Sequence, residues 1–303
     1  MSSLWAVTSY YNPAGFRIKK NNYLLFSESL KKQGVPLITM EMAEGTSSLE
    51  NDKYTYTIQG KDILWQKERL LNLGMEKLPR ECRYVVWLDC DVIFSDEDWA
   101  AEAEKQLEKY TVIQPFETAV RLPKDHSFFQ GEGESWNSFA KIFREEPNLF
   151  LFGEFDAHGH SGFAWGARRD LFQKHRLYDC CILGSGDHMM AHAFAGDWQS
   201  YCIRRIFRNN KTHFSHFQAW AKRIYSEIKA SIGTCSSALY HLWHGDAENR
   251  KYVSRNWKLA EFQFDPDKDV KIGKSGLFEW NSDKIELHKY CENYFLERKE
   301  DGI

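Results

Sequence analysis

Two aspartates directly follow a short apolar run, and they are the residues of this chain best suited to chemistry. Residues 84–88 read YVVWL and lead into Asp89-Cys90-Asp91. The run is rich in β-branched and aromatic residues and short for a helix, so it predicts a buried strand. Because side chains alternate along a strand, both carboxylates are expected on the same side. A divalent cation relieves their repulsion, and carboxylate oxygens suit Mg²⁺ or Mn²⁺. The motif therefore predicts a metal and a phosphate-bearing ligand; the alternative is a turn cap at Asp89 beside a solvated Asp91.

A histidine pair near residue 240 could complete such a site. Residues 238–243 predict a strand, and His241-Leu242-Trp243-His244-Gly245 spans its end. Neutral imidazole can bind a metal ion, and a following glycine allows close approach of the backbone. A spacing of three places the two histidines on opposite sides of a strand, so we expect one ligand and favour His244 over His241. The alternative is that both are structural.

A third candidate is the carboxylate of Asp187. The preceding Gly184-Ser185-Gly186 predicts a tight turn that opens a helix. A carboxylate in the first turn of a helix is favoured by the helix dipole. The functional interpretation makes Asp187 a general base that deprotonates an acceptor hydroxyl. The alternative is a helix cap without chemistry.

Cations that could hold a diphosphate stand beside these motifs. Lys67 opens a predicted helix, and Arg250 follows the His244-Gly245 turn. Each of them alone is more typical of a solvated surface charge. Their place beside the other candidates makes them diphosphate-binding hypotheses.

The elements that must position these residues alternate along the first third of the chain. Strands are predicted over 4–10, 37–42 and from 84, and helices over 21–32 and 62–73. This order is typical of a parallel, doubly wound α/β sheet, in which ligands gather at the carboxyl ends of the strands. We expect 45–60 to be a loop or short hairpin and 115–150 to be irregular. Later segments predict further strands at 111–114 and 162–165, and helices at 96–109, 168–175, 249–261 and 282–298.

Composition sets limits on the class of protein. The 303 residues carry a net charge of −3, so no global basic field indicates nucleic acid. Seven scattered cysteines without a CxxC pair fit a reducing compartment. Neither a secretory signal nor an apolar run of spanning length is visible. We expect a soluble, cytoplasmic protein without a transmembrane segment.

Together the motifs resemble those of a GT-A fold, metal-dependent glycosyltransferase. The resemblance lies in Lys67-Glu68, the DxD triplet 89–91, the segment 162–169 (GFAWGARR) and Gly184-Ser185-Gly186-Asp187, and it covers roughly residues 4 to 250. It implies a Rossmann-like α/β sandwich with a mostly parallel central sheet and flanking helices. Residues 1–250 would form the nucleotide-sugar-binding catalytic domain. Residues 251–303 would form a helical extension packed on the same domain.

The resemblance also implies roles for single residues. Asp89, Asp91 and His244 would bind Mn²⁺ or Mg²⁺, and Asp187 would be the base of an inverting transfer. The donor would be a nucleotide-diphosphate sugar, with UDP-sugar expected. Its binding would use Thr8, Ser9, Tyr11, Arg17, Lys67, Asp89 and Arg250. Two departures leave the stereochemistry open, with inversion favoured: Gly186 stands where many inverting members carry a second acidic residue, and 241–245 lacks the histidine-glycine-lysine signature of retaining relatives.

The acceptor and the competing classes stay open. The basic and aromatic segment 203–229 fits an amphipathic helix with a solvated face. Otherwise it could contact a glycan, a lipid-linked acceptor, or DNA carrying a hydroxymethylated pyrimidine. One alternative class is a sugar-nucleotide nucleotidyltransferase, although the turn at 12–17 has only one glycine where such enzymes carry a glycine-rich loop. The other is a non-catalytic carbohydrate- or nucleic-acid-binding protein, which would not explain the metal motif.

Overall fold

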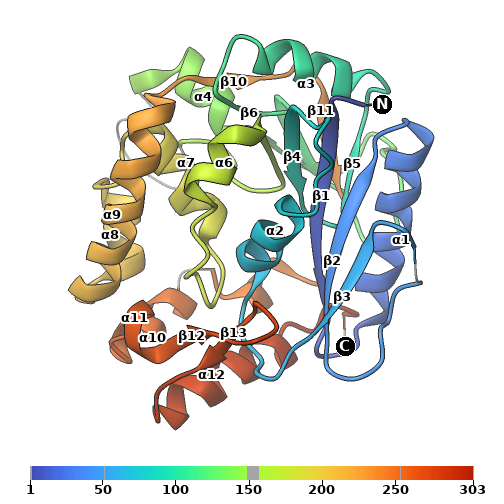
Figure 1. Ribbon diagram of the computed structural model, residues 1–303. Coiled ribbons are helices and arrows are strands. Elements are labelled where there is room, and N and C mark those ends of the chain that lie inside the picture. Colours follow the sequence, from blue (N-terminus) through green and yellow to red (C-terminus); the bar gives the residue numbers. More distant parts are fainter. Residues whose placement is uncertain (1, 51, 149–156, 253, 303) are drawn as a thin grey trace.

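The protein is built around a seven-stranded mixed sheet (Figure 1). The computed structural model describes residues 2–50, 52–148, 157–252 and 254–302. The strand order is β10-β6-β9-β4-β1-β2-β3. Its strands are β1 (Leu4–Tyr11), β2 (Leu37–Ala43), β3 (Thr55–Gln59), β4 (Tyr84–Leu88), β6 (Val112–Gln114), β9 (Ala164–Arg168) and β10 (Ile232–Thr234). Only β9 pairs antiparallel with its neighbours, β4 and β6. The predicted α/β class with a mostly parallel central sheet is confirmed.

Both faces of the central strands are buried, in two separate apolar clusters. Trp5 and Val7 pack on one face with α2 (Lys67–Met75), whereas Leu4 and Ala6 pack on the other with α1 (Arg17–Lys32) and α3 (Trp99–Leu107). Alternation along β1 sends successive side chains to opposite clusters. This two-sided burial explains why β1, β2 and β4 have nearly continuous apolar sequences.

Two sequence predictions about irregular segments are wrong. The segment 45–60 is not a hairpin, because β3 within it pairs parallel with β2 at the edge of the sheet. The segment 115–150 contains β7 (Thr118–Arg121), β8 (Glu134–Asn137) and α4 (Phe139–Glu145), while 149 and 150 lie outside the described residues. β8 is largely exposed and β3 is half-buried at the edge of the sheet, so neither has the nearly continuous apolar sequence of the central strands.

A second sheet brings the histidine pair to the aspartates. Its order is β5-β11-β7-β8, with β5 at Val92–Phe94 and β11 at Ala238–His241. His241 pairs with Val92 in the antiparallel register, and the Leu242 amide donates to the Asp91 carbonyl at 2.9 Å. Residues separated by about half the chain thereby meet beyond the end of β4.

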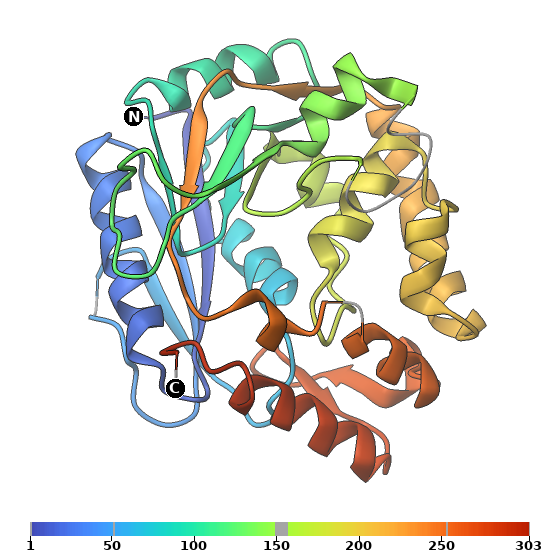
Figure 2. The same cartoon turned by 180° about the vertical axis from the view of Figure 1, so that it is seen from behind.

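The remaining helices close the site from the other side. They are α6 (Arg169–His175), α7 (Gly186–Ala195), α8 (Tyr201–Phe207) and α9 (Lys211–Ile228). The C-terminal segment adds η1 (Ala247–Arg250), α10 (Ser254–Glu261), α11 (Pro266–Asp269), β12 (Val270–Ile272), β13 (Phe278–Trp280) and α12 (Ile285–Leu296). It lies against the carboxyl end of β1, where the Tyr11 and Phe295 rings are 5.2 Å apart (Figure 2). Within the described residues, no helix is long and apolar enough to cross a bilayer.

Candidate active site

Asp89 and Asp91 lie in the turn between β4 and β5 and face different partners. Asp89 forms an ion pair with Lys67, which also reaches Asp187 Oδ2 at 2.7 Å. Asp91 faces His241, the last residue of β11, and His244 instead. The expectation that both carboxylates share one side of a strand is wrong, because β4 ends at Leu88 and the alternation ends with it.

Asp91, His241 and His244 form the first candidate metal site. Their ligand atoms all lie within 4.8 Å of one another. His244 Nε2 is 3.3 Å from Asp91 Oδ2, and His241 Nε2 is 3.6 Å from Asp91 Oδ1. Asp91 Oδ1 is buried and has no hydrogen-bond partner among the described residues. The expectation that only one histidine faces the site is wrong, because the strand ends at His241 and the chain turns before His244.

The electrostatics of this cluster favour a cation. Burial raises the pKa of Asp91 to about 6, although the nearby Lys19 and Arg250 oppose the shift. Burial lowers the pKa of His241 well below its ordinary value, which keeps the imidazole in its neutral, metal-binding form. The residues therefore fit a divalent metal ion. One carboxylate with two imidazoles departs from the all-oxygen set that Mg²⁺ prefers, because imidazole is a ligand typical of transition-metal ions.

A buried charge network from the C-terminal segment supports this cluster. Arg250 donates to the His244 carbonyl at 2.7 Å and lies 3.7 Å from Glu300, a carboxylate that is 2% exposed. Arg298 reaches the same carboxylate at 2.7 Å. Such outer contacts orient metal-ligating residues. Arg250 thus lies beside His244, as the sequence predicts, and its guanidinium already donates a hydrogen bond within the protein.

Asp187 opens α7 on the opposite side of Lys67. The turn before it is held at Ser185, whose hydroxyl accepts from Asn256 at 2.9 Å and from Arg255 at 3.1 Å. The Glu68 side chain leaves room only for glycine at position 186, because a Cβ there would lie 2.2 Å from Glu68 Oε1. Burial raises the pKa of Glu68 to about 8. The acidic residue that Gly186 replaces in the family pattern would have no room here.

These groups face one cavity of about 620 Å³. The predicted site residues that line it are Ser9, Tyr11, Lys67, Asp89, Asp91, Asp187, His244 and Arg250. Two others do not. Thr8 is fully buried and donates to the Leu88 carbonyl at 2.8 Å. The Arg17 side chain is 87% exposed and pairs loosely with Asp301 at 3.9 Å.

Other residues of the cavity were missed in the sequence. Trp136, Trp257 and Tyr252 give it aromatic walls, and Arg121 and His160 add polar ones. Burial lowers the pKa of His160 to about 3, and its ring stacks on Phe163 at 3.9 Å. These residues stand on loops and short elements, where no periodic pattern marks them. The 11 tryptophans of the chain are the signal in its composition that favours aromatic walls.

The basic and aromatic segment 203–229 contains most of α8 and the whole of α9. On α9, Phe217 and Trp220 are buried in the core, whereas Lys222, Arg223 and Lys229 are exposed. A surface for stacking bases needs exposed aromatic rings beside the cations. The face of α9 is therefore that of an amphipathic helix with a solvated basic side.

The comparisons with known proteins find likeness in structure alone. No protein-family model and no curated protein matches the chain. Among solved structures, it is similar to a mutant of Drosophila β1,4-galactosyltransferase 7 in complex with manganese, UDP-Gal and xylobiose (12% identity, 96% of this chain and 99% of that one, TM-score 0.41). It is also similar to the mannosyltransferase PcManGT from Pyrobaculum calidifontis in complex with GDP-Man and Mn²⁺ (13% identity, 75% and 69%, TM-score 0.39). A third is 4-diphosphocytidyl-2C-methyl-D-erythritol synthase from Anaerococcus prevotii (9% identity, 77% and 86%, TM-score 0.37).

Proposed function

We propose that the protein is a metal-dependent glycosyltransferase, which moves a sugar from a nucleoside-diphosphate sugar to an acceptor hydroxyl. One observation carries the proposal: the Asp91–His241–His244 cluster and the Asp187 carboxylate face the same cavity, with Lys67 between Asp89 and Asp187. A metal ion on the three ligands would neutralise the diphosphate as it leaves. The expected metal is Mn²⁺, and UDP-sugars are the first donors to test.

The residues divide the work between the two ends of the cavity. At one end, Asp91 and the two histidines would hold the ion, and Arg250 would keep His244 in place. At the other end, Asp187 would accept the proton of the acceptor hydroxyl as the sugar–oxygen bond forms. Lys67 would orient Asp187 through their ion pair, while its predicted contact with the diphosphate stays a prediction. Ser9 and Tyr11, at the carboxyl end of β1, would contact the nucleoside. A single displacement with Asp187 as base would invert the anomeric carbon.

The acceptor proposed is a glycan rather than DNA. Trp136 and Trp257 line the cavity, and apolar aromatic faces pack well against sugar rings. The aromatic residues expected to stack on bases lie in the core under α9. As for domains, we propose that 251–303 belongs to the catalytic unit, because Arg298 and Glu300 support the metal cluster.

A nucleotidyltransferase is the second candidate class. The turn after β1 argues against this class. The Asn12 side chain accepts a hydrogen bond from the Phe16 amide at 3.0 Å, which closes the turn locally. The turn contains one glycine, Gly15, with a φ of 68°. A loop that binds a triphosphate with its backbone amides needs several glycines, because these residues allow the required backbone conformations.

A panel of nucleotide sugars incubated with Mn²⁺ tests the proposal. We expect release of the nucleoside diphosphate and transfer to a sugar acceptor, both abolished by a chelator. Pyrophosphate formation from a nucleoside triphosphate and a sugar phosphate would instead establish the second candidate. Binding of sugars without turnover of any donor would support a non-catalytic protein.

A further inference from the structure

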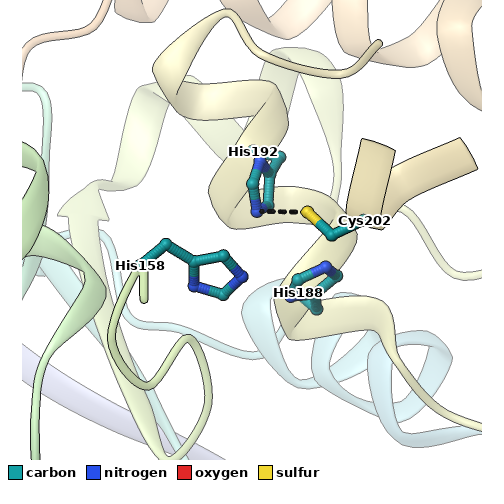
Figure 3. A group of neighbouring side chains, drawn as sticks. All are labelled: His158, His188, His192 and Cys202. Carbon is teal, nitrogen blue, oxygen red and sulfur yellow. Dashed lines mark hydrogen bonds between the residues drawn. The ribbon is translucent and has the colours of Figure 1, made fainter. Parts of the chain in front are cut away.

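A second group of metal-ligand side chains lies beside the cavity, and two of its members, His188 and Cys202, are among the residues that line it. His158, His188, His192 and Cys202 are all buried, and their ligand atoms lie within 4.8 Å of one another. Figure 3 shows the imidazoles of His158, from the loop before β9, and of His188 and His192, from α7, gathered around the Cys202 thiol at the start of α8. Nothing in the proposed transfer reaction uses these residues. Their assembly from three separate segments needs its own explanation.

The spacing within the cluster is close to that of a tetrahedral site. Bonds of ordinary length from zinc to nitrogen and sulfur place neighbouring ligand atoms about 3.3–3.6 Å apart. Cys202 Sγ and His192 Nε2 are 3.4 Å apart (Figure 3). The other separations between ligand atoms are at most 4.8 Å, so metal binding would draw these side chains closer together. His188 and His192 are four residues apart on one helix and so share a face.

Hydrogen bonds to Nδ1 of His192 and His158 leave the Nε2 atom of each ring available to a metal ion. His192 Nδ1 lies 3.1 Å from Asp197 Oδ2, which makes Nδ1 the protonated nitrogen and gives Nε2 the lone pair. His158 Nδ1 lies 2.8 Å from the Gly159 carbonyl, with the same consequence for its Nε2. A carboxylate or carbonyl on the far nitrogen is the usual arrangement of metal-bound histidine.

We propose that His158, His188, His192 and Cys202 form a second metal site, which takes a zinc-class divalent ion. Three imidazoles and a thiolate are the soft donors that Zn²⁺ prefers over Mg²⁺ or Mn²⁺, and four protein ligands close its coordination sphere. Binding releases the thiol proton of Cys202 to solvent, since the metal-bound form is the thiolate. The ion clamps the loop that carries His158 to α7 and α8. This inference does not rest on the proposed transferase function.

The competing interpretation is a packed core of neutral rings. The three imidazoles lie 4.7–5.0 Å apart by their centroids, and the Phe139 ring is 5.2 Å from His192. Edge-to-face packing of this kind occurs without any metal ion. A packed core and a metal site differ in whether the protein retains zinc and whether its thiol becomes a metal-bound thiolate.

Metal content and cobalt spectroscopy on the full-length protein distinguish the two. We expect stoichiometric zinc to survive dialysis against buffer and to be removed by a strong chelator. Replacement by Co²⁺ should give the intense visible bands of a tetrahedral ion together with a thiolate-to-cobalt charge-transfer band in the near ultraviolet. Because the Asp91 cluster has no thiol, this last band should persist in Asp91→Ala.

The matched pair of cysteine variants is Cys202→Ser and Cys82→Ser. Both thiols are buried, 5% and 3% exposed, and burial raises the pKa of each to about 11. Cys202→Ser should lose the charge-transfer band and Cys82→Ser should retain it. The proposal is overturned if folded wild-type protein retains no zinc and shows no such band, or if the band survives unchanged in Cys202→Ser. The wild-type measurement decides the question even if Cys202→Ser does not fold.

Discussion

The two clusters of metal-ligand side chains differ in donor type and number. Asp91, His241 and His244 present oxygen and nitrogen to a cavity of about 620 Å³. His158, His188, His192 and Cys202 present nitrogen and sulfur; all four are buried, and His188 and Cys202 also border the cavity. Three ligands leave positions for a diphosphate, whereas four ligands close the sphere. If both proposed sites bind metal, the number and softness of their ligands would separate an exchangeable, reactive ion from a permanent, structural one.

Helix α7 joins the two regions. Asp187, in its first turn, faces the cavity; His188 and His192 belong to the buried cluster, and His188 also borders the cavity. The same helix therefore positions the proposed base and half of the buried cluster. Variants on either side of α7, or in the helix itself, therefore test whether the two clusters act independently.

The largest effect is expected from Asp91→Ala. Loss of the metal removes several kcal/mol of stabilisation from the departing diphosphate, so we expect kcat/KM to fall by roughly 10³-fold. The measurement is Mn²⁺-dependent nucleotide release. The exposed Asp98, which lies on the same stretch of chain, supplies the control Asp98→Ala, expected to keep full activity. Equal activity of the two variants would remove Asp91 from the mechanism.

Asp187→Asn tests the base at the other end of the cavity. We expect kcat for transfer to fall by roughly 10²-fold, since general base catalysis contributes at least that much, while the Kd for Mn²⁺ stays unchanged. Steady-state transfer assays and Mn²⁺ titrations give the two values. A variant that transfers sugar at the wild-type rate would show that the base lies elsewhere.

Gly186→Ala tests the helix that serves both clusters. The new methyl group would lie 2.2 Å from the Glu68 carboxyl, which is 1% exposed and cannot move aside. We expect the free energy of unfolding to fall by about 2 kcal/mol in urea titrations. Gly273→Ala is the matched control: its methyl group would also lie 2.2 Å from a glutamate, Glu279, but that side chain is half-buried and can rotate. A destabilisation shared equally by both variants would argue against a rigid Glu68.

Asp197→Asn affects only the buried cluster. Its carboxylate orients His192 from behind, and loss of such a partner weakens metal binding by roughly tenfold. Competition with a coloured zinc chelator measures the change, and Mn²⁺-dependent activity should be untouched. The exposed Asp170 supplies the control Asp170→Asn. Unchanged zinc affinity in Asp197→Asn would weaken the case for a metal ion on His192.

His213 is a buried histidine outside either cluster and gives the smallest effect. It packs between Phe207 and Phe264, and burial lowers its pKa to about 3. The unfolded chain protonates this imidazole below pH 6.5 while the folded chain does not, so the folded state loses stability as the pH falls. Between pH 7 and 5.5 the loss from this group is about 1 kcal/mol. His213→Phe should flatten the slope of stability against pH over that range, and an unchanged slope would contradict it.

The sequence was most informative where local pattern decides structure. The apolar runs of β1, β2 and β4 and the helices between them predict the sheet, because strands that are buried on both faces have nearly continuous apolar sequences. Asp89 and Asp91 were placed at the correct strand end for the same reason. Of the Asp91–His241–His244 cluster, Asp91 and His244 were predicted as ligands and His241 was not favoured, while the predicted ligand Asp89 pairs with Lys67 instead. Whether His241 faces Asp91 depends on the pairing of β11 with β5, a contact between distant segments that spacing alone does not encode.

The buried cluster shows the same limit more strongly. The spacing of His188 and His192 was a visible signal on a predicted helix. His158 and Cys202 join them only through the packing of a loop and of α8, which have no periodic pattern. Thr8 shows the reverse failure, since its position at a strand end is correct but its hydroxyl bonds to β4 rather than facing the cavity.

Electron paramagnetic resonance measures the signal of free Mn²⁺ during a titration with the protein. This measurement tests directly whether Asp91, His241 and His244 bind a metal ion. Wild-type protein with a nucleoside diphosphate should remove the free-ion signal stoichiometrically. Asp91→Ala and His241→Ala should leave most of it, whereas Cys202→Ser should behave as the wild type does. If Asp91→Ala depletes free Mn²⁺ as the wild-type protein does, the metal does not bind at Asp91, His241 and His244, and the account of the active site is wrong.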